Sequence, residues 1–223
     1  MKITLPDNSS RELPEGSSGY DLAKDIGPGL AKSAVAVSVD GVQRDLHDVI
    51  EGDSSVSIIT IDSDEGIEIM RHTLTAQVLA RAIKNLYPKS KLAIGPTIDD
   101  GFYYDVESEK SISSDDLSNI EDEMKKIIKT KSSITKKLVS KSEALKVFKE
   151  NKESYKEIIV NESKQKDNFQ LYYQDDKKFV DLCRGPHLPN LEFIGSFKLT
   201  KVSGAYWKGD SANAMLTRIY GTA

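Results

Sequence analysis

Short apolar segments separated by turn signals fill the first 60 positions, and this pattern restricts the fold more than any other feature. The segment "AVAVSV" (34–39) alternates with the period of a strand and runs into Asp40-Gly41, a common hairpin turn. Ser18 can cap a helix through "GYDLAKDI", which Gly27-Pro28-Gly29 should stop. Strands on both sides of one helix predict a small β-grasp domain over residues 1–62.

A larger second unit is expected over residues 63–223, after the polar linker "DSDEG". Its apolar residues predict a long helix over about 67–86, with Ile69, Leu79 and Ile83 on one buried face. Further helices are expected near residues 117–127 and after Ser142. From Glu157 onward the segments "EIIV", "FQLYYQ", "KFVDLC", "SFKLTKVSGAYW" and "AMLTRIYG" indicate strands. The expected fold class is therefore α+β, with a mainly antiparallel sheet in the second unit.

Composition excludes several classes of protein. The apolar runs are too short to span a membrane, and the N-terminus lacks the apolar segment of a signal peptide. A single cysteine cannot form an internal disulfide, which favours a cytoplasmic location. The net charge of −4 does not indicate nucleic-acid binding, but eight lysines and one acid lie between Lys125 and Lys146. This run is either the solvated face of a surface helix or a patch that meets phosphates.

The segment "VDLCRGPHLPN" (180–190) concentrates the groups that could carry chemistry. Cys183 and His187 are metal-ligand types, and His72 could supply a third ligand, but a closed structural zinc site needs four. Cys183 could also be a nucleophile, given activation by a neighbouring base or positive charge. A third possibility is a polar pocket in which Asp181 and His187 perform acid–base work beside the Gly185-Pro186 turn. The residues alone leave these alternatives, and a plain strand-end loop, open.

Several motifs together resemble the N-terminal half of bacterial threonyl-tRNA synthetases. They are spread over the whole chain: "ITLPDNS", "DIGPGLAK", "SIIT", "AIGPTIDDGFYYD", "ESYK", "CRGPH", "SGAYWKGD" and "RIYGTA". The resemblance implies a TGS domain of β-grasp fold at 1–62 and an editing domain at 63–223, of the kind shared with alanyl-tRNA synthetases. Editing domains of this family hydrolyse serine that is wrongly attached to threonine tRNA.

The resemblance also implies roles for individual residues. Asp181, His187 and Cys183 should lie in the hydrolytic pocket, and Lys156 should add a cationic group that orients water or stabilises charge. Gly95 and Tyr104 should line the pocket around the terminal adenosine and the amino acid. A separate hydrolytic site is needed because the one methyl that distinguishes threonine from serine gives only about 1–3 kcal/mol of discrimination.

The expected partners are tRNA(Thr) and its mischarged form, Ser-tRNA(Thr). No cofactor and no metal are expected in this chain, because ATP, Mg and Zn belong to the catalytic core of the family, whose ATP-binding motifs are missing here. The chain stops at "RIYGTA", where the linker to that core begins in the family, so an N-terminal fragment is expected, with a freestanding editing protein as the other possibility. The full-length protein is expected to be a homodimer through contacts in the core.

One departure from the family pattern concerns the long helix. The family carries a His-x-x-x-His pair there, whereas this chain has "RHTLTAQVLARAIK", with His72 followed five residues later by Gln77. On a regular α-helix these two residues point about 140° apart, and Thr73 is the residue one turn before Gln77. Either the helix begins after His72 or carries a π-bulge that returns His72 to the pocket, or His72 is misplaced. Thr73 and Gln77 are therefore candidate substrate-binding residues, and editing is expected to be weakened or lost.

Overall fold

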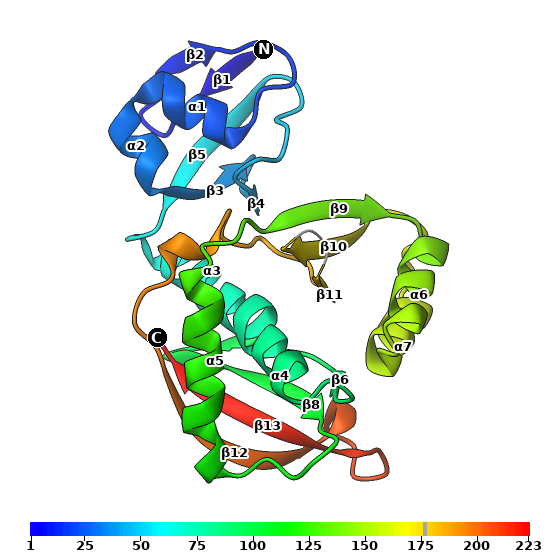
Figure 1. Cartoon of the computed structure of the whole chain (residues 1–223). Helices are drawn as coiled ribbons and strands as arrows, with labels where there is room; N and C mark the ends of the chain where they lie inside the picture. Colours follow the sequence, from blue (N-terminus) through cyan, green and yellow to red (C-terminus); the bar gives the residue numbers. More distant parts are fainter. Residues whose placement is uncertain (176–177) are drawn as a thin grey trace.

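The computed structural model describes residues 1–175 and 178–223. Figure 1 shows the N-terminal sheet and its helices at one end of the molecule, with the second unit below them. The N-terminal sheet has the order β2-β1-β5-β3-β4, in which β1 and β5 are parallel and the other pairs are antiparallel. Its strands are β1 (Lys2–Thr4), β2 (Ser10–Glu12), β3 (Ala34–Val39), β4 (Val42–Asp45) and β5 (Ser54–Thr60). This mixed sheet confirms the predicted β-grasp arrangement.

Helix α1 (Gly19–Ile26) begins where the sequence predicts. Ser18 caps it, since its hydroxyl accepts from Asp21 N–H while the Asp21 carboxylate accepts from Ser18 N–H in return. Leu22 and Ala23 are buried against the sheet. Gly27 ends α1, but Pro28 starts a second short helix, α2 (Pro28–Ser33), because proline is well suited to the first helical position.

The long helix of the second unit runs without a break from Asp64 to Leu86, but its middle is not α-helical. It consists of α3 (Asp64–Thr73), a π-helical segment (Leu74–Leu79) and α4 (Ala80–Leu86). In the π segment, Ala80 N–H donates to the Thr75 carbonyl, five residues back. The extra residue that the sequence shows between His72 and Gln77 is thus accommodated by a π turn, which was one of the two predicted outcomes.

Two antiparallel sheets, rather than one, form the β-structure of the second unit. The smaller has the order β11-β10-β9, with strands at Phe179–Leu182, Phe169–Gln174 and Thr135–Val139. The larger has the order β12-β13-β8-β6, and β7 also pairs with β8. Its strands are β6 (Lys91–Leu92), β7 (Thr97–Ile98), β8 (Gly101–Glu107), β12 (Lys198–Tyr206) and β13 (Met215–Thr222). The π segment, α4 and α5 (Leu117–Lys129) share the main core with this sheet.

The strand expected at "EIIV" is wrong. Residues 157–160 belong to helix α7 (Ser154–Glu162), which packs beside α6 (Lys141–Glu150) at one side of the molecule (Figure 1). The β-branched residues favour a strand locally, but Val160 is fully buried in one cluster with Ala144 and Phe148 of α6. Tertiary packing therefore decides the conformation here. The cap of α6 is Ser140, two residues before the predicted Ser142.

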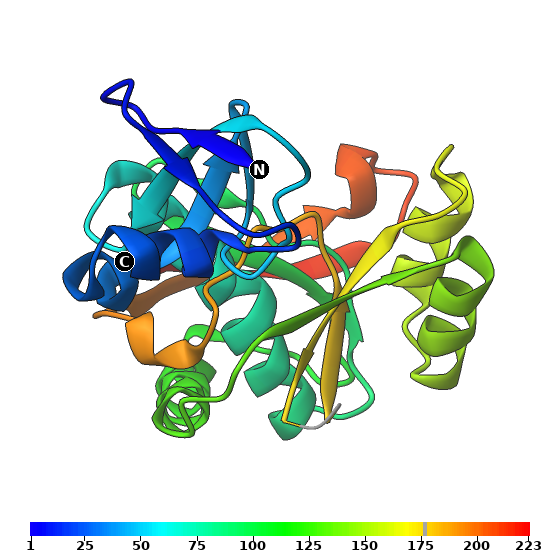
Figure 2. The same ribbon diagram turned by 90° about the horizontal axis from the view of Figure 1, so that it is seen from above.

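The two units meet beside β9 and β10. Seen from above in Figure 2, the N-terminal unit (blue) lies on the opposite side of the molecule from α6 and α7 (yellow-green), and the segment that follows β11 (orange) is visible next to it. Lys136 of β9 forms ion pairs with Asp45 and Asp48 of the N-terminal unit. Among the described residues, none of the helices has the length and apolar character that a membrane crossing requires.

Candidate functional site

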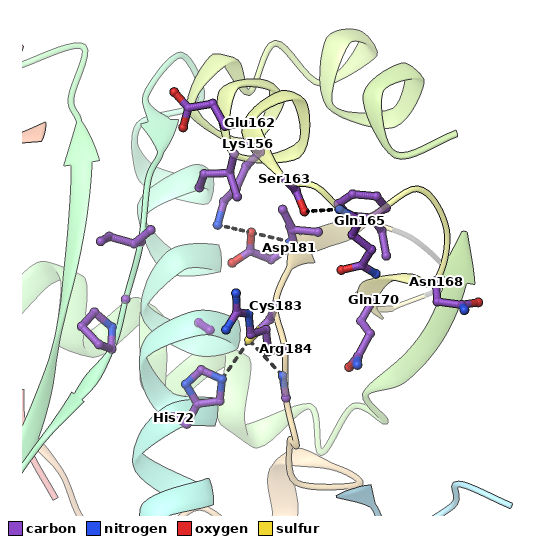
Figure 3. Close-up of a pocket in the computed structure, with 18 residues that line it drawn as sticks. His72, Lys156, Glu162, Ser163, Gln165, Asn168, Gln170, Asp181, Cys183 and Arg184 are labelled. Atoms are coloured by element: carbon purple, nitrogen blue, oxygen red, sulfur yellow. Dashed lines mark hydrogen bonds and ion pairs between the residues drawn. The ribbon is translucent and has the colours of Figure 1, made fainter. Parts of the chain in front are cut away.

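A cavity of about 610 Å³ lies between the long helix, α7 and the β10–β11 hairpin (Figure 3). Its walls come from segments far apart in the sequence. Five residues predicted from the sequence line it: His72, Gly95, Lys156, Asp181 and Cys183. His187, which was also predicted to lie in the pocket, is buried against the His72 ring and does not line the cavity. A cavity of this size with a few converging polar groups is typical of a small-molecule or substrate-end site.

One half of the cavity is charged. Lys156 Nζ on α7 lies 2.7 Å from Asp181 Oδ1 at the end of β11, and both side chains are almost fully buried. Behind them, Tyr104 donates from its hydroxyl to Asp181 Oδ2 at 3.2 Å. Burial raises the pKa of Asp181, while the Lys156 ammonium opposes that shift. Tyr104 therefore supports the carboxylate from behind and does not line the cavity as expected.

The other half of the cavity is neutral. His72 Nε2 lies 2.8 Å from Cys183 Sγ, and the His72 ring stacks on the His187 ring at 4.7 Å. Burial lowers the pKa of His72 to about 4 and raises the pKa of Cys183 to about 11. Near neutral pH the cluster therefore holds a neutral imidazole and a protonated thiol. A thiol in this state is a poor nucleophile, which argues against covalent catalysis by Cys183.

Thr73 fixes the orientation of the His187 ring. Its hydroxyl donates to the Ile69 carbonyl at 2.8 Å, so its oxygen is left to accept from Leu188 N–H and from His187 Nδ1, 3.2 Å away. This assigns the proton of His187 to Nδ1. The unprotonated Nε2 of His187 is buried and has no hydrogen-bond partner within the described chain. Thr73 thus lies behind the imidazoles rather than in the cavity.

Gly95 is placed where a larger residue would not fit. A Cβ at this position would lie 2.2 Å from the Tyr104 ring and 2.7 Å from Thr75 Oγ1. The backbone of Gly95 therefore forms the cavity wall directly against Tyr104, in agreement with the predicted position.

The π turn returns His72 to the cavity but turns Gln77 away from it. Gln77 is fully buried and accepts from Gln174 Nε2 through both its backbone carbonyl and its side-chain oxygen. The cavity-lining residue one turn after His72 is Ala76. The helix thus offers one imidazole and one methyl group to the cavity, and the substrate-binding role predicted for Gln77 has no support in its position.

Three groups of this site could hold a metal ion. The ligand atoms of His72, Cys183 and His187 all lie within 4.8 Å of one another. Two imidazoles and a thiol are a set that suits Zn²⁺, with a fourth position open. Binding would displace the thiol proton and separate the closely placed His72 and Cys183. The expectation that this chain has no metal site is therefore not supported by the geometry.

Sequence reasoning missed the residues at the mouth and at the back of the site. Arg184 and Asn168 are exposed and line the mouth of the cavity, where Figure 3 shows them on either side of Gln170. At the back, Tyr172 packs edge-on against the His187 ring at 4.5 Å. Arg184 lies within the quoted "CRGPH" and could have been noted there, but nothing local marks Asn168 or Tyr172.

Comparison with known proteins agrees with this architecture. Residues 1–60 match the TGS domain family, and residues 170–220 match the threonyl and alanyl tRNA synthetase second additional domain. The chain is 48% identical over 221 residues to a threonine–tRNA ligase of Hahella chejuensis and 47% identical over 223 residues to one of Paracidovorax citrulli. The chain corresponds to the TGS and editing region of threonine–tRNA ligases.

This editing region is only part of the ligases that it matches. The chain covers 99% or 100% of its own length in these comparisons but spans 34% of each ligase. The catalytic core of the ligases lies outside the matched region. Activity, substrate and partners therefore have to be argued from the site itself.

The lysine run of the editing region is spread over α5, the turn that follows it, β9 and α6, and is not one helix face. Several of its lysines are engaged with acids or backbone oxygens: Lys125, Lys126, Lys131, Lys136 and Lys141. Fewer positive charges are thus available for phosphates than the count along the sequence indicates.

Proposed function

We propose that the chain hydrolyses the ester bond of Ser-tRNA(Thr) in the cavity between the long helix and α7. The observation that carries this proposal is the buried Lys156–Asp181 ion pair facing the His72–Cys183 pair across one cavity. A buried cation and neutral imidazoles are the groups that water-mediated ester hydrolysis requires. The family match is consistent with this reaction.

In the proposed mechanism, the aminoacyl ester enters past Arg184 and places its carbonyl beside Lys156. The ammonium group stabilises the negative charge that develops on the carbonyl oxygen when water attacks the carbonyl carbon. Asp181 holds Lys156 in place. His72 and Cys183 orient the attacking water through hydrogen bonds. Cleavage of the ester carbon–oxygen bond then releases serine and the free tRNA 3′ end, whose oxygen takes up the proton that water loses.

Selectivity for serine would come from the rigid wall at Gly95. Tyr104 packs against the Gly95 backbone from behind, since a Cβ there would lie 2.2 Å from the Tyr104 ring, so the wall has no room to move back when a larger substrate side chain meets it. A threonine methyl that met such a wall would displace the ester from Lys156. The site would thus release serine and spare correctly attached threonine.

A deacylation assay tests this proposal. The 223-residue chain is mixed with Ser-tRNA(Thr) or Thr-tRNA(Thr), and release of labelled amino acid is followed. We expect serine to be released much faster than threonine, and Lys156→Met to abolish release. Lys91→Met is the matched control, because Lys91 also pairs with a carboxylate, Glu107, but lies outside the cavity. Failure of the unsubstituted chain to release serine would contradict the proposal.

A second candidate is a tRNA-binding appendage whose editing activity has decayed. The observation that favours it is the methyl of Ala76 at the place where the helix faces the cavity one turn after His72. The expected weakening of editing remains a prediction on this basis. Binding of tRNA(Thr) without release of serine would identify this second function, and binding that weakens steeply with salt would show contacts to phosphates.

A further inference from the structure

One carboxylate of the N-terminal unit reaches the back of the editing site. Asp45, the last residue of β4, accepts the backbone N–H of His187 on Oδ1 at 2.8 Å. Its second oxygen, Oδ2, accepts the hydroxyl of Tyr172 at 2.8 Å. Both partners belong to the second unit, more than 120 residues away along the chain. The Asp45 side chain thus links the N-terminal unit directly to His187, the imidazole that stacks on His72.

Two aromatic rings pack on the His187 ring, and one of them, Tyr172, is hydrogen-bonded to Asp45. The edge of Tyr172 packs on the ring at 4.5 Å, and the His72 ring stacks on it at 4.7 Å. Burial and the Asp45 carboxylate raise the pKa of Tyr172, so its phenol stays protonated and remains a donor. Close packing leaves the loop before His187 no room to move inward, since a Cβ on Gly185 would lie 2.0 Å from the Tyr172 hydroxyl.

We propose that Asp45 is a positioning residue of the editing site, through which the β-grasp domain holds the His187 loop and the Tyr172 ring in place. The inference rests on the proposed function, since it assigns the β-grasp domain a part in that reaction. Asp45 is largely buried, so its hydrogen bonds compete little with water. Lys136 Nζ lies 2.9 Å from Asp45 Oδ2, and this ion pair holds the carboxylate in position.

Asp48 offers a matched control three residues further along. It pairs with the same Lys136 from the same unit, but in the described part of the chain its side chain forms no hydrogen bond with His187 or Tyr172. Loss of Asp48 therefore weakens the contact between the units without removing the support of His187. If the Asp45 and Asp48 variants differ in activity, the effect of Asp45 comes from positioning His187 and not only from holding the two units together.

The experiment measures kcat and KM for Ser-tRNA(Thr) in the chain carrying Asp45→Ala, Asp45→Asn or Asp48→Ala. We expect Asp45→Ala to lower kcat by about 10- to 100-fold with little change in KM. A shift of the His187 ring also moves the His72 ring stacked on it, and displacement of such a water-orienting group by about 1 Å can cost on the order of 100-fold. Asp45→Asn should recover part of the rate, since its oxygen can still accept from His187. Asp48→Ala should match the unsubstituted chain.

A second measurement separates failure of this inference from failure of the proposed function. The ¹⁵N signals of the His187 imidazole report its proton at Nδ1 without need of substrate. They should shift or broaden in Asp45→Ala and not in Asp48→Ala. If the unsubstituted chain releases no serine, the proposed function fails and these signals alone decide the inference.

The positioning role is overturned if the Asp45 and Asp48 variants have the same kcat and the same His187 signals. If Asp45→Ala does not fold, Asp45→Asn and Tyr172→Phe take its place. Tyr172→Phe removes one hydrogen bond to Asp45 but keeps the ring on His187. An unchanged kcat and unchanged His187 signals in both variants would equally overturn it.

Discussion

Lys156 and Asp181 in one half of the cavity are buried, His72 and Cys183 in the other half are partly buried, and the two halves respond to burial in opposite ways. Lys156 and Asp181 remain as a hydrogen-bonded pair, with Tyr104 as a further donor to the carboxylate. His72 and Cys183 are neutral, because burial lowers the pKa of one and raises the pKa of the other. A buried charge persists only where an opposite charge and hydrogen bonds compensate its lost hydration. The two halves therefore suit different tasks. Lys156 and Asp181 can stabilise charge, whereas His72 and Cys183 can orient water without being charged themselves.

Of the changes considered, removal of one member of the Lys156–Asp181 pair should have the largest effect on stability and deacylation. Lys156→Met leaves the Asp181 carboxylate buried without its cation, and loss of one partner of a buried pair costs about 3–5 kcal/mol. We expect a loss of this size in the free energy of unfolding, measured by urea denaturation, together with loss of deacylation. The double variant Lys156→Met/Asp181→Asn should regain stability but not activity. Equal stability of the single and double variants would show that the pair is not electrostatically coupled.

The lowered pKa of His72, in the neutral half of the cavity, should make the free energy of unfolding depend on pH. His72 has a pKa of about 4 in the folded chain, below the ordinary value of 6.5, so the unfolded chain binds a proton first as pH falls. The free energy of unfolding should therefore decrease between about pH 6.5 and pH 4, by about 3 kcal/mol from His72, since one pKa unit corresponds to about 1.4 kcal/mol.

The variant His72→Gln isolates this contribution from those of His187 and Asp181, which also titrate abnormally. Urea denaturation at several pH values should give a flatter curve for the variant than for the unsubstituted chain. Parallel curves would mean that the pKa of His72 is the same in the folded and the unfolded chain, so that burial does not keep this half of the cavity neutral.

Most of the fold could be predicted from the sequence because local signals and packing agree over most of the chain. The β-grasp strands, the cap at Ser18 and the long helix all follow from alternation, capping and spacing. The helix at "EIIV" could not be predicted, because its β-branched residues favour a strand and only contact with α6 overrides them.

The site was predictable in its residues more than in its geometry. Gly95, Lys156, Asp181 and Cys183 line the cavity as the resemblance implied, and His72 joins them through the π turn. The direction of Gln77 could not be read from the sequence, because it depends on where the extra residue is absorbed along the helix. Asp45 was missed because its contact with His187 joins residues 142 positions apart, and no local pattern marks it.

Two neighbouring positions of the π segment test whether its two faces differ as the structure indicates. Gln77→His should destabilise the chain by about 1–3 kcal/mol, since Gln174 loses a buried hydrogen-bond partner at the side chain. It should not increase deacylation, because the new imidazole would point at Gln174 rather than at the ester. Ala76→His places the same group against the cavity, where it can occupy open space, and should cost less stability. Thermal denaturation of the two variants, with deacylation as a second readout, shows which of the two positions faces the cavity. The opposite result would be that Gln77→His costs less stability than Ala76→His and also increases deacylation. Residue 77 would then face the cavity, and the π turn would not set the direction of the helix side chains.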